Sequence, residues 1–210
     1  MKQALLILAM IYSCNSIAQK PTLLFVIESG VEDEKEIVAV PFVMYTKGKY
    51  EIPPTCEIGA IGTRAINECN KAKKIIKPLV QKGQLLYLVE NGKQSGTARI
   101  IKTVEFGLSD WLSFSGALET KPLAKILTNN PALGLKTPKE ITKASPTLKT
   151  RKDSEGNILS DELFEKIDID GDGIAEFIYR CNDFEGQFYE IYSFKNNAWK
   201  KVYSGGYQGV

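Results

Sequence analysis

The chain has 210 residues, of which 43% are hydrophobic and 25% are charged, so it has the composition of a globular protein and the length for a real core. Its net charge of +2 indicates neither nucleic acid nor an acidic membrane as a partner. The sequence contains no histidine, which excludes Ser-His and Cys-His catalysis, His-ligated zinc and imidazole general bases.

Residues 1–18 have the pattern of a secretory signal peptide. Lys2 precedes an apolar run at 4–12 that is too short to span a bilayer, and Ser16-Ile17-Ala18 has the small-x-small form of a cleavage site. We therefore expect a secreted or periplasmic protein without a transmembrane span. The alternative is a lipoprotein anchored at Cys14.

Export permits disulfide bonds, and three cysteines remain after cleavage. Cys56 and Cys69 are close in sequence and are the predicted pair, since a loop of this size stabilises a fold by roughly 3 kcal/mol in the chain-entropy model. Cys181 is then left as a buried free thiol or as the partner of a cysteine on another chain.

Residues 19–135 are predicted to form a β-rich region with one helix. Strand-like segments lie at 22–27, 37–44, 84–90, 97–106 and 111–115, whereas 123–128 fits a short helix or a strand. The helix is predicted over 63–77, because its apolar residues recur at helical spacing and Pro78 ends it. From 136 to 160 the chain is predicted to be a linker or long surface loop, rich in Lys, Thr, Pro and Ser at its start.

The stretch from Asp168 to Glu176 is the one that indicates a ligand. It carries aspartates at alternate positions, two glycines and a closing glutamate. Calcium takes six to eight oxygens at roughly 2.3–2.6 Å, and a tight loop of alternating acids can fold several carboxylates around one point. We predict Asp168, Asp170, Asp172 and Glu176 as side-chain ligands, with the carbonyl group of Ile174 completing the site.

Two other interpretations of this stretch remain open. An EF-hand loop needs an apolar residue at position eight and a bidentate Glu at position twelve, where this chain has Ala175 and Tyr179. Alternatively, the two Asp-Gly pairs form turns between strands and bind no metal. Four acids within nine residues would repel one another without a cation, which favours the metal site. Magnesium fits less well because it requires a strict octahedron.

The loop resembles the D-x-D-G-D-G-x-x-[DE] calcium loop of FG-GAP and VCBS repeats. The resemblance covers about ten residues and occurs once, whereas a propeller needs several repeats at a fixed period, so it implies the ligand roles and not a propeller. The C-terminal segment also resembles small exported bacterial proteins without an assigned activity, which supports export and the calcium loop and implies no reaction.

Residues 161–210 are predicted to form a β-meander that begins with this loop, with strands at 174–181, 187–194 and 198–203. Half of the chain's 20 aromatic residues lie in its last 43 residues, so one face of the sheet is expected to pack as core. The other face could present Tyr189, Trp199 or Tyr203 as a stacking platform for a sugar.

These patterns predict an α+β fold that is mainly antiparallel β, and they leave three classes of function. We expect a secreted, non-catalytic structural or binding module in which calcium stabilises the C-terminal sheet. The second hypothesis is a module that recognises a glycan or a surface protein through its aromatic residues. The third is a hydrolase with Asp183 paired with Glu185 or Glu190, which requires two acids about 5–10 Å apart across a cleft.

Overall fold

The structure, a computed structural model, describes residues 20–29, 37–57, 62–108, 111–139, 141, 144–152, 155–156, 158–183 and 186–209. The predicted signal peptide and the alternative anchor at Cys14 lie outside these residues. In the part of the chain that is described, no helix combines the length and the apolar character needed to cross a membrane. One α-helix and two sheets of antiparallel strands confirm the α+β, mainly β, prediction for the described residues.

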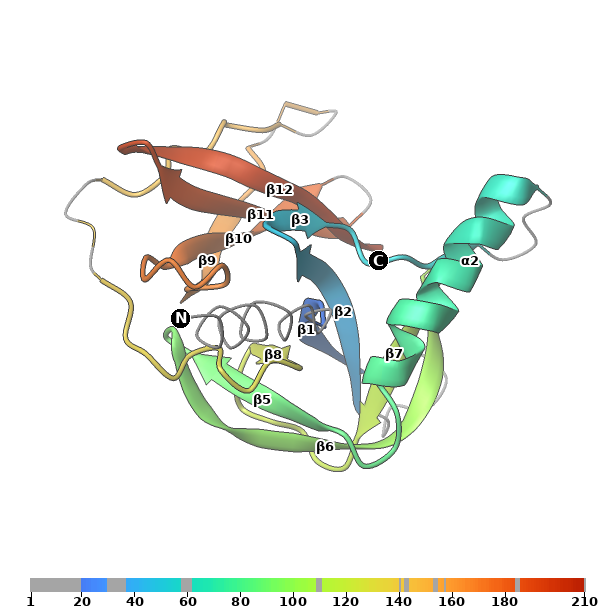
Figure 1. The fold of residues 1–210 in the computed structure, drawn as a ribbon. Coiled ribbons are helices and arrows are strands. Elements are labelled where there is room, and N and C mark those ends of the chain that lie inside the picture. The colour runs from blue at the N-terminus through green and yellow to red at the C-terminus, as the bar shows by residue number, and fades with distance from the viewer. Residues whose placement is uncertain are drawn as a thin grey trace, which may run out of the picture.

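The N-terminal part of the chain forms an eight-stranded sheet that closes on itself (Figure 1). The strand order is β3-β2-β1-β8-β5-β6-β7-β4, and an additional pairing of β2 with β7 closes the ring. The strands are β1 (Thr22–Ser29), β2 (Ile37–Thr46), β3 (Lys49–Glu51), β4 (Cys56–Glu57), β5 (Leu85–Glu90), β6 (Lys93–Leu108), β7 (Trp111–Leu118) and β8 (Ile126–Thr128). We call this the ring sheet.

The C-terminal part forms a four-stranded meander in the order β12-β11-β10-β9. Its strands are β9 (Asp161–Ile167), β10 (Glu176–Asp183), β11 (Gly186–Lys195) and β12 (Ala198–Gly209). Three of these strands correspond to predicted ones. The fourth, β9, was not among the predicted strands, and it pairs with β10 through a register shift at Ile178/Tyr179. We call this the C-terminal sheet.

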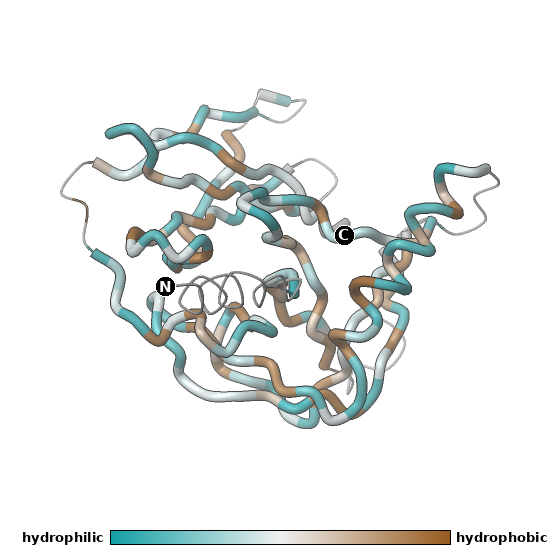
Figure 2. Tube along the Cα trace, in the orientation of Figure 1, coloured by the Kyte–Doolittle hydropathy of each residue, from teal (hydrophilic) through white to brown (hydrophobic). Residues whose placement is uncertain are grey.

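Helix α2 (Thr63–Ile75) and the short helix η1 (Lys77–Leu79) pack against the ring sheet. The predicted disulfide between Cys56 and Cys69 is confirmed, and it joins β4 to α2. The helix touches the body along one side: it is largely hydrophilic (Figure 2), and Ala72 is its buried residue. Ile66, which the helical pattern placed on the apolar face, is 56% exposed.

The central strands of the ring sheet are covered on both faces, because alternate side chains enter two different cores. Leu23 and Phe25 of β1 point into a core inside the ring that also contains residues of α2 and η1. Leu24 and Val26 point the other way, into a core between the two sheets. A strand buried on both faces reads as a continuous apolar run, as β1 and β2 do.

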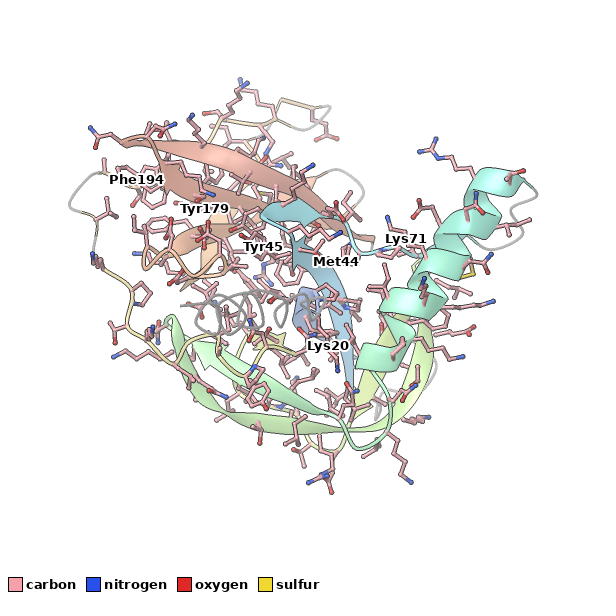
Figure 3. All side chains as sticks on the ribbon, in the orientation of Figure 1. Lys20, Met44, Tyr45, Lys71, Tyr179 and Phe194 are labelled. Atoms are coloured by element: carbon pink, nitrogen blue, oxygen red, sulfur yellow. A yellow bond between two sulfur atoms is a disulfide. The ribbon has the colours of Figure 1, made fainter. Side chains whose placement is uncertain are left out.

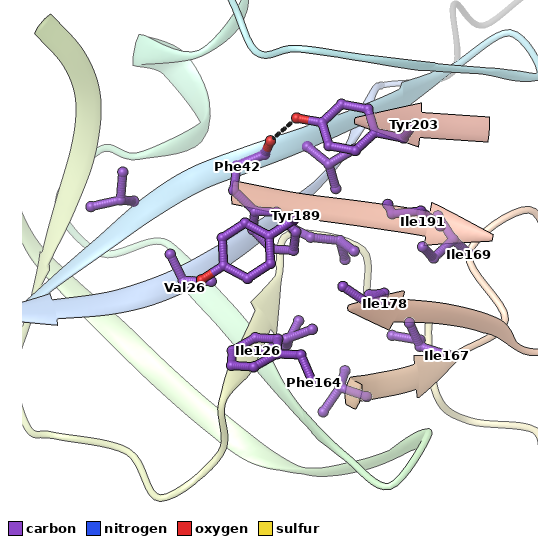
Figure 4. Packing of buried hydrophobic residues seen from close by; sticks show 14 of the residues in the cluster. Val26, Phe42, Ile126, Phe164, Ile167, Ile169, Ile178, Tyr189, Ile191 and Tyr203 are labelled. Atoms are coloured by element: carbon purple, nitrogen blue, oxygen red, sulfur yellow. Dashed lines mark hydrogen bonds between the residues drawn. The ribbon is translucent and has the colours of Figure 1, made fainter. Parts of the chain in front are cut away.

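The core between the two sheets, which we call the intersheet core, is formed from both parts of the chain (Figure 4). The ring of Tyr189 lies 4.4 Å from that of Phe42 and 5.3 Å from that of Phe164, measured between centroids. The hydroxyl group of Tyr203 donates a hydrogen bond to the carbonyl oxygen of Phe42. The C-terminal sheet therefore buries one face against the ring sheet.

The segment predicted as a linker lies against the outer face of the C-terminal sheet where it is described. The indole Nε1 of Trp199 donates to the carbonyl oxygen of Ala144 at 2.8 Å. Arg151 forms an ion pair with Asp161, and its guanidinium group lies 4.6 Å from the ring centroid of Phe188. The segment thus covers aromatic residues that would otherwise face solvent.

Candidate metal centre

The acidic loop connects β9 to β10, and its own backbone folds it into a compact turn. Gly171 and Gly173 have φ angles of 78° and 88°, which glycine adopts without steric cost. The Asp168 carboxylate accepts the Gly171 N–H at 2.8 Å with one oxygen and the Gly173 N–H at 3.0 Å with the other. These bonds fold the second half of the loop back over Asp168.

The folded loop brings three of the predicted ligands together. One carboxylate oxygen from each of Asp168, Asp170 and Glu176 lies within 4.8 Å of the other two. Two oxygens bound to the same calcium ion are at most roughly 5 Å apart, given the usual metal–oxygen distances. Glu176 is 1% exposed, while Asp168 and Asp170 are half-buried. This acidic group could therefore hold a metal ion, with one ligand in the protein interior.

Burial makes negative charge costly at this position. Burial raises the pKa of Glu176 to about 8; the Ile169 N–H, 2.7 Å from Glu176 Oε2, opposes the shift, and the charge of Asp170 adds to it. Burial also raises the pKa of Asp168, against the two backbone hydrogen bonds that it accepts. A cation bound among these oxygens would offset both effects.

Lys195, at the end of β11, supplies positive charge to the loop. Its Nζ lies 3.0 Å from Asp170 Oδ2. The hydrogen bond to Asp170 raises the pKa of Lys195, so this side chain stays an ammonium ion. A metal ion that used both oxygens of Asp170 would compete with this ammonium group for the same carboxylate.

The β2–β3 hairpin of the ring sheet reaches the loop from the other side. Tyr45 lies where β2 approaches the C-terminal sheet (Figure 3), and burial followed by the charge of Asp170 raises its pKa. Tyr50 packs on Tyr45 with 4.8 Å between the ring centroids, and burial followed by the charge of Glu176 raises its pKa well above the usual range. The acidic loop therefore lies at the junction of the two sheets.

The other two predicted ligands lie in the same loop but outside the cluster of three. Asp172 is exposed, and its Oδ1 accepts the Ile174 N–H at 2.8 Å. Ile174 forms an isolated parallel bridge with Lys139, whose N–H donates to the Gly173 carbonyl oxygen at 2.8 Å.

The residues of the predicted aromatic platform do not share a surface. Tyr189 and Tyr203 are buried in the intersheet core, at 2% and 5% exposure. Trp199 lies on the opposite face of the sheet, where its ring contacts those of Phe177 and Phe194. A platform made of all three residues is therefore absent from the described part of the structure.

Of the acids considered for hydrolysis, Glu190 is already paired. Its carboxylate accepts the hydroxyl of Tyr192 and the ammonium of Lys201, each at 2.7 Å. Glu185 and the side chain of Asp183 lie outside the described residues.

Sequence reasoning did not identify three residues that surround the cluster: Lys195, Tyr50 and Ser193. They lie on other strands and have no local motif, so only the pairing of strands brings them to the loop. A search against protein-family models, curated proteins and solved structures found no match to this chain.

Proposed function

We propose that this chain is a secreted, non-catalytic structural or binding module whose C-terminal sheet is stabilised by calcium. Asp168, Asp170 and Glu176 would hold the ion, with Asp172 and the Ile174 carbonyl group as further ligands. The observation that carries the proposal is the approach of three carboxylate oxygens to within 4.8 Å, one of them from a fully buried glutamate. A divalent cation would neutralise them and fix the start of β10 against the end of β9.

Calcium is the cation that these oxygen ligands favour. Calcium tolerates irregular sites of carboxylates and carbonyls, whereas magnesium requires a strict octahedron and retains its waters. Extracellular modules bind calcium with dissociation constants of about 0.1–1 mM, which suits a permanent structural ion outside the cell. The Cys56–Cys69 disulfide is compatible with an oxidising compartment, and so supports export.

Recognition of a glycan is the second candidate, and a cavity beside the acidic loop favours it. The cavity has a volume of about 320 Å³, and Phe177 and Trp199 line it together with Asn91 and Lys139. Aromatic faces and amide groups are the surfaces that sugar rings contact in proteins. A glycan array probed with the wild type and with Trp199→Ala tests this candidate: binding that the substitution abolishes would support it.

Calcium titration of the mature chain by calorimetry, with thermal melts in calcium and in chelator, tests the main proposal. A site with a dissociation constant of about 0.1–1 mM should raise the melting temperature by roughly 3–10 °C at 10 mM calcium. Asp170→Asn should abolish both the heat of binding and this rise. A wild-type protein that gives no heat and melts identically in calcium and chelator would refute the proposal.

Glu165 offers a matched control, because it is also a buried acid of the C-terminal sheet. Its carboxylate accepts backbone N–H groups of Asn91 at 3.0 Å, Gly92 at 3.2 Å and Lys166 at 2.8 Å. Glu165→Gln weakens these bonds and should lower the melting temperature equally with and without calcium. Its calcium affinity should equal that of the wild type, which separates loss of the ion from general destabilisation.

A further inference from the structure

Two hydroxyl groups beside Glu176 have no hydrogen-bond partner of good geometry among the described residues. Ser193 of β11 is 1% exposed and its Oγ is buried without a partner. The hydroxyl group of Tyr50, on β3, is also buried without a hydrogen-bond partner. Buried polar groups without partners reduce stability, and nearly all such groups in folded proteins are satisfied. Both hydroxyl groups are close enough to interact with the Glu176 carboxyl group, and neither makes a hydrogen bond of good geometry to it in this structure.

Both hydroxyl groups lie near the same side chain. Glu176 and Ser193 are the next residues beyond the Phe177–Tyr192 pair of β10 and β11, so they are neighbours across the two strands. Burial raises the pKa of Glu176, and the nearby Ser193 hydroxyl acts in the opposite direction. Burial raises the pKa of Tyr50, and the charge of Glu176 raises it further. The Glu176 carboxyl group therefore lies near a hydroxyl of the ring sheet and a hydroxyl of the C-terminal sheet.

A bound cation would give these hydroxyls their partner. Glu176 Oε2 already accepts the Ile169 N–H at 2.7 Å, and each carboxylate oxygen can accept more than one hydrogen bond. A metal ion keeps the carboxylate ionised and fixes its orientation. Hydroxyl groups rotate readily, so they can donate hydrogen bonds to the carboxylate in that orientation. Groups that hold a ligating carboxylate in this way raise its affinity for the metal.

We propose that Tyr50 and Ser193 are positioning residues of the cation site, each donating a hydrogen bond to the Glu176 carboxylate when the ion is bound. This inference rests on the proposed calcium function. Because Tyr50 belongs to the ring sheet and Ser193 to the C-terminal sheet, the ion would clamp the β2–β3 hairpin onto the C-terminal sheet. The cation site then stabilises the junction of the two sheets as well as its own loop.

Tyr50→Phe is the decisive variant, because it removes the hydroxyl and retains the ring that packs on Tyr45. We expect calcium to bind roughly 10–100-fold more weakly in calorimetry, the usual effect of losing a group that orients a metal ligand. The melting temperature in chelator should stay the same or rise, since a buried group without a partner is removed. Ser193→Ala should also weaken calcium binding, and its melting temperature in chelator should also stay the same or rise.

Tyr203→Phe is the matched control. Tyr203 also has a buried hydroxyl at the junction of the sheets, but this group donates to the Phe42 carbonyl oxygen. Its loss should lower the melting temperature in chelator and leave the calcium affinity unchanged. Hydrogen exchange gives a second measurement: calcium should slow exchange of the amides of 49–51 in the wild type and not in Tyr50→Phe.

The outcomes separate this inference from the proposed function. A wild-type protein that does not bind calcium refutes the proposed function itself. If the wild type binds calcium and both Tyr50→Phe and Ser193→Ala retain its affinity, the positioning role is overturned and the calcium site stands. If the two variants lose stability in chelator and no affinity for calcium, the hydroxyls are structural and the inference also fails.

Discussion

The ring sheet and the C-terminal sheet share the intersheet core, but their remaining surfaces are stabilised in different ways. The ring sheet encloses an apolar core, and α2 is joined to it by a disulfide bond. The C-terminal sheet packs one face in the intersheet core and aromatic rings on the other face, and it also makes several polar contacts. They include the acidic loop, the Arg151–Asp161 ion pair and the Lys201–Glu190 ion pair.

This difference implies that the two regions respond to different conditions. Apolar burial and a disulfide bond are insensitive to pH and to cations, whereas clustered carboxylates are sensitive to both. Ionic conditions should therefore change the stability of the protein through the C-terminal sheet and its junction with the ring sheet, and not through the core inside the ring. The chain carries two tryptophans, Trp111 on β7 and Trp199 on β12, so fluorescence of single-tryptophan variants can follow each region.

The largest expected effect is a fall in the stability of the calcium-free protein as pH rises. The pKa of Glu176 is about 8 in the folded protein against 4.5 for an ordinary glutamate. The proton bound by the folded state stabilises it fully below pH 4.5, and this stabilisation is lost as pH rises through 8. The free energy of unfolding, measured in urea with chelator present, should fall by about 5 kcal/mol over this range, at 1.36 kcal/mol per pKa unit.

Calcium and a neutral substitution should both remove this pH dependence. Glu176→Gln carries no titrating group at this position, so its stability in chelator should be nearly flat with pH. Saturating calcium should keep the wild type as stable at pH 8 as at lower pH, because the ion stabilises the ionised carboxylates. A calcium-free wild type that becomes more stable between pH 5 and pH 8 would contradict the assignment of a protonated Glu176.

Truncation of the intersheet core should affect both regions together. Tyr189 is 2% exposed and its ring lies between those of Phe42 and Phe164. Tyr189→Ala should lower the free energy of unfolding by about 3–5 kcal/mol, the usual cost of removing a buried aromatic ring. In urea, Trp111 and Trp199 should report one common transition in the wild type. If they already report separate transitions there, the two sheets unfold independently and the shared core is energetically minor.

Loss of the disulfide bond should lower the stability of the protein without affecting the calcium site. The cysteines are 13 positions apart, and a loop of this size contributes about 3 kcal/mol in the chain-entropy model. The double substitution Cys56→Ser, Cys69→Ser should therefore lower the midpoint of urea unfolding with and without calcium. The calcium affinity should not change, because the two cysteines pack in the core inside the ring and not in the intersheet core. A weaker affinity would show that the two regions are more closely coupled than their contacts indicate.

The features that could be predicted from sequence are those encoded locally. Cys56 and Cys69 are close in sequence, the helix pattern at 63–77 is regular, and the loop from Asp168 to Glu176 concentrates its acids in a short span. The strands of the C-terminal meander are also separated by short turns with Asn, Asp and Gly. Each of these patterns depends on neighbours in the chain, so composition and spacing were sufficient.

The features that were not predicted depend on contacts between distant segments. Four of the seven residues of β9 are charged, yet it forms a strand because Phe164 and Ile167 bury their side chains in the intersheet core and Glu165 binds the turn at Asn91 and Gly92. Tyr189 and Tyr203 are core residues because of the register of β11 with β12, not because of their own chemistry. Tertiary burial here outweighs local propensity.

The smallest expected effect concerns Lys195, whose ammonium group pairs with Asp170 at 3.0 Å and is 42% exposed. The Asp170 side chain is only 7% exposed, so Lys195→Met should lower the melting temperature in chelator slightly, because it leaves this carboxylate without its cation. It should tighten calcium binding by roughly two- to fivefold, because the ion no longer competes with the ammonium group for Asp170.

Lys201→Met is the matched control: this lysine pairs with Glu190 on the same sheet, and its loss should leave calcium affinity unchanged. Calorimetry of both variants at low salt would decide the matter, and weaker calcium binding by Lys195→Met would mean that the lysine supports the loop rather than competing with the ion.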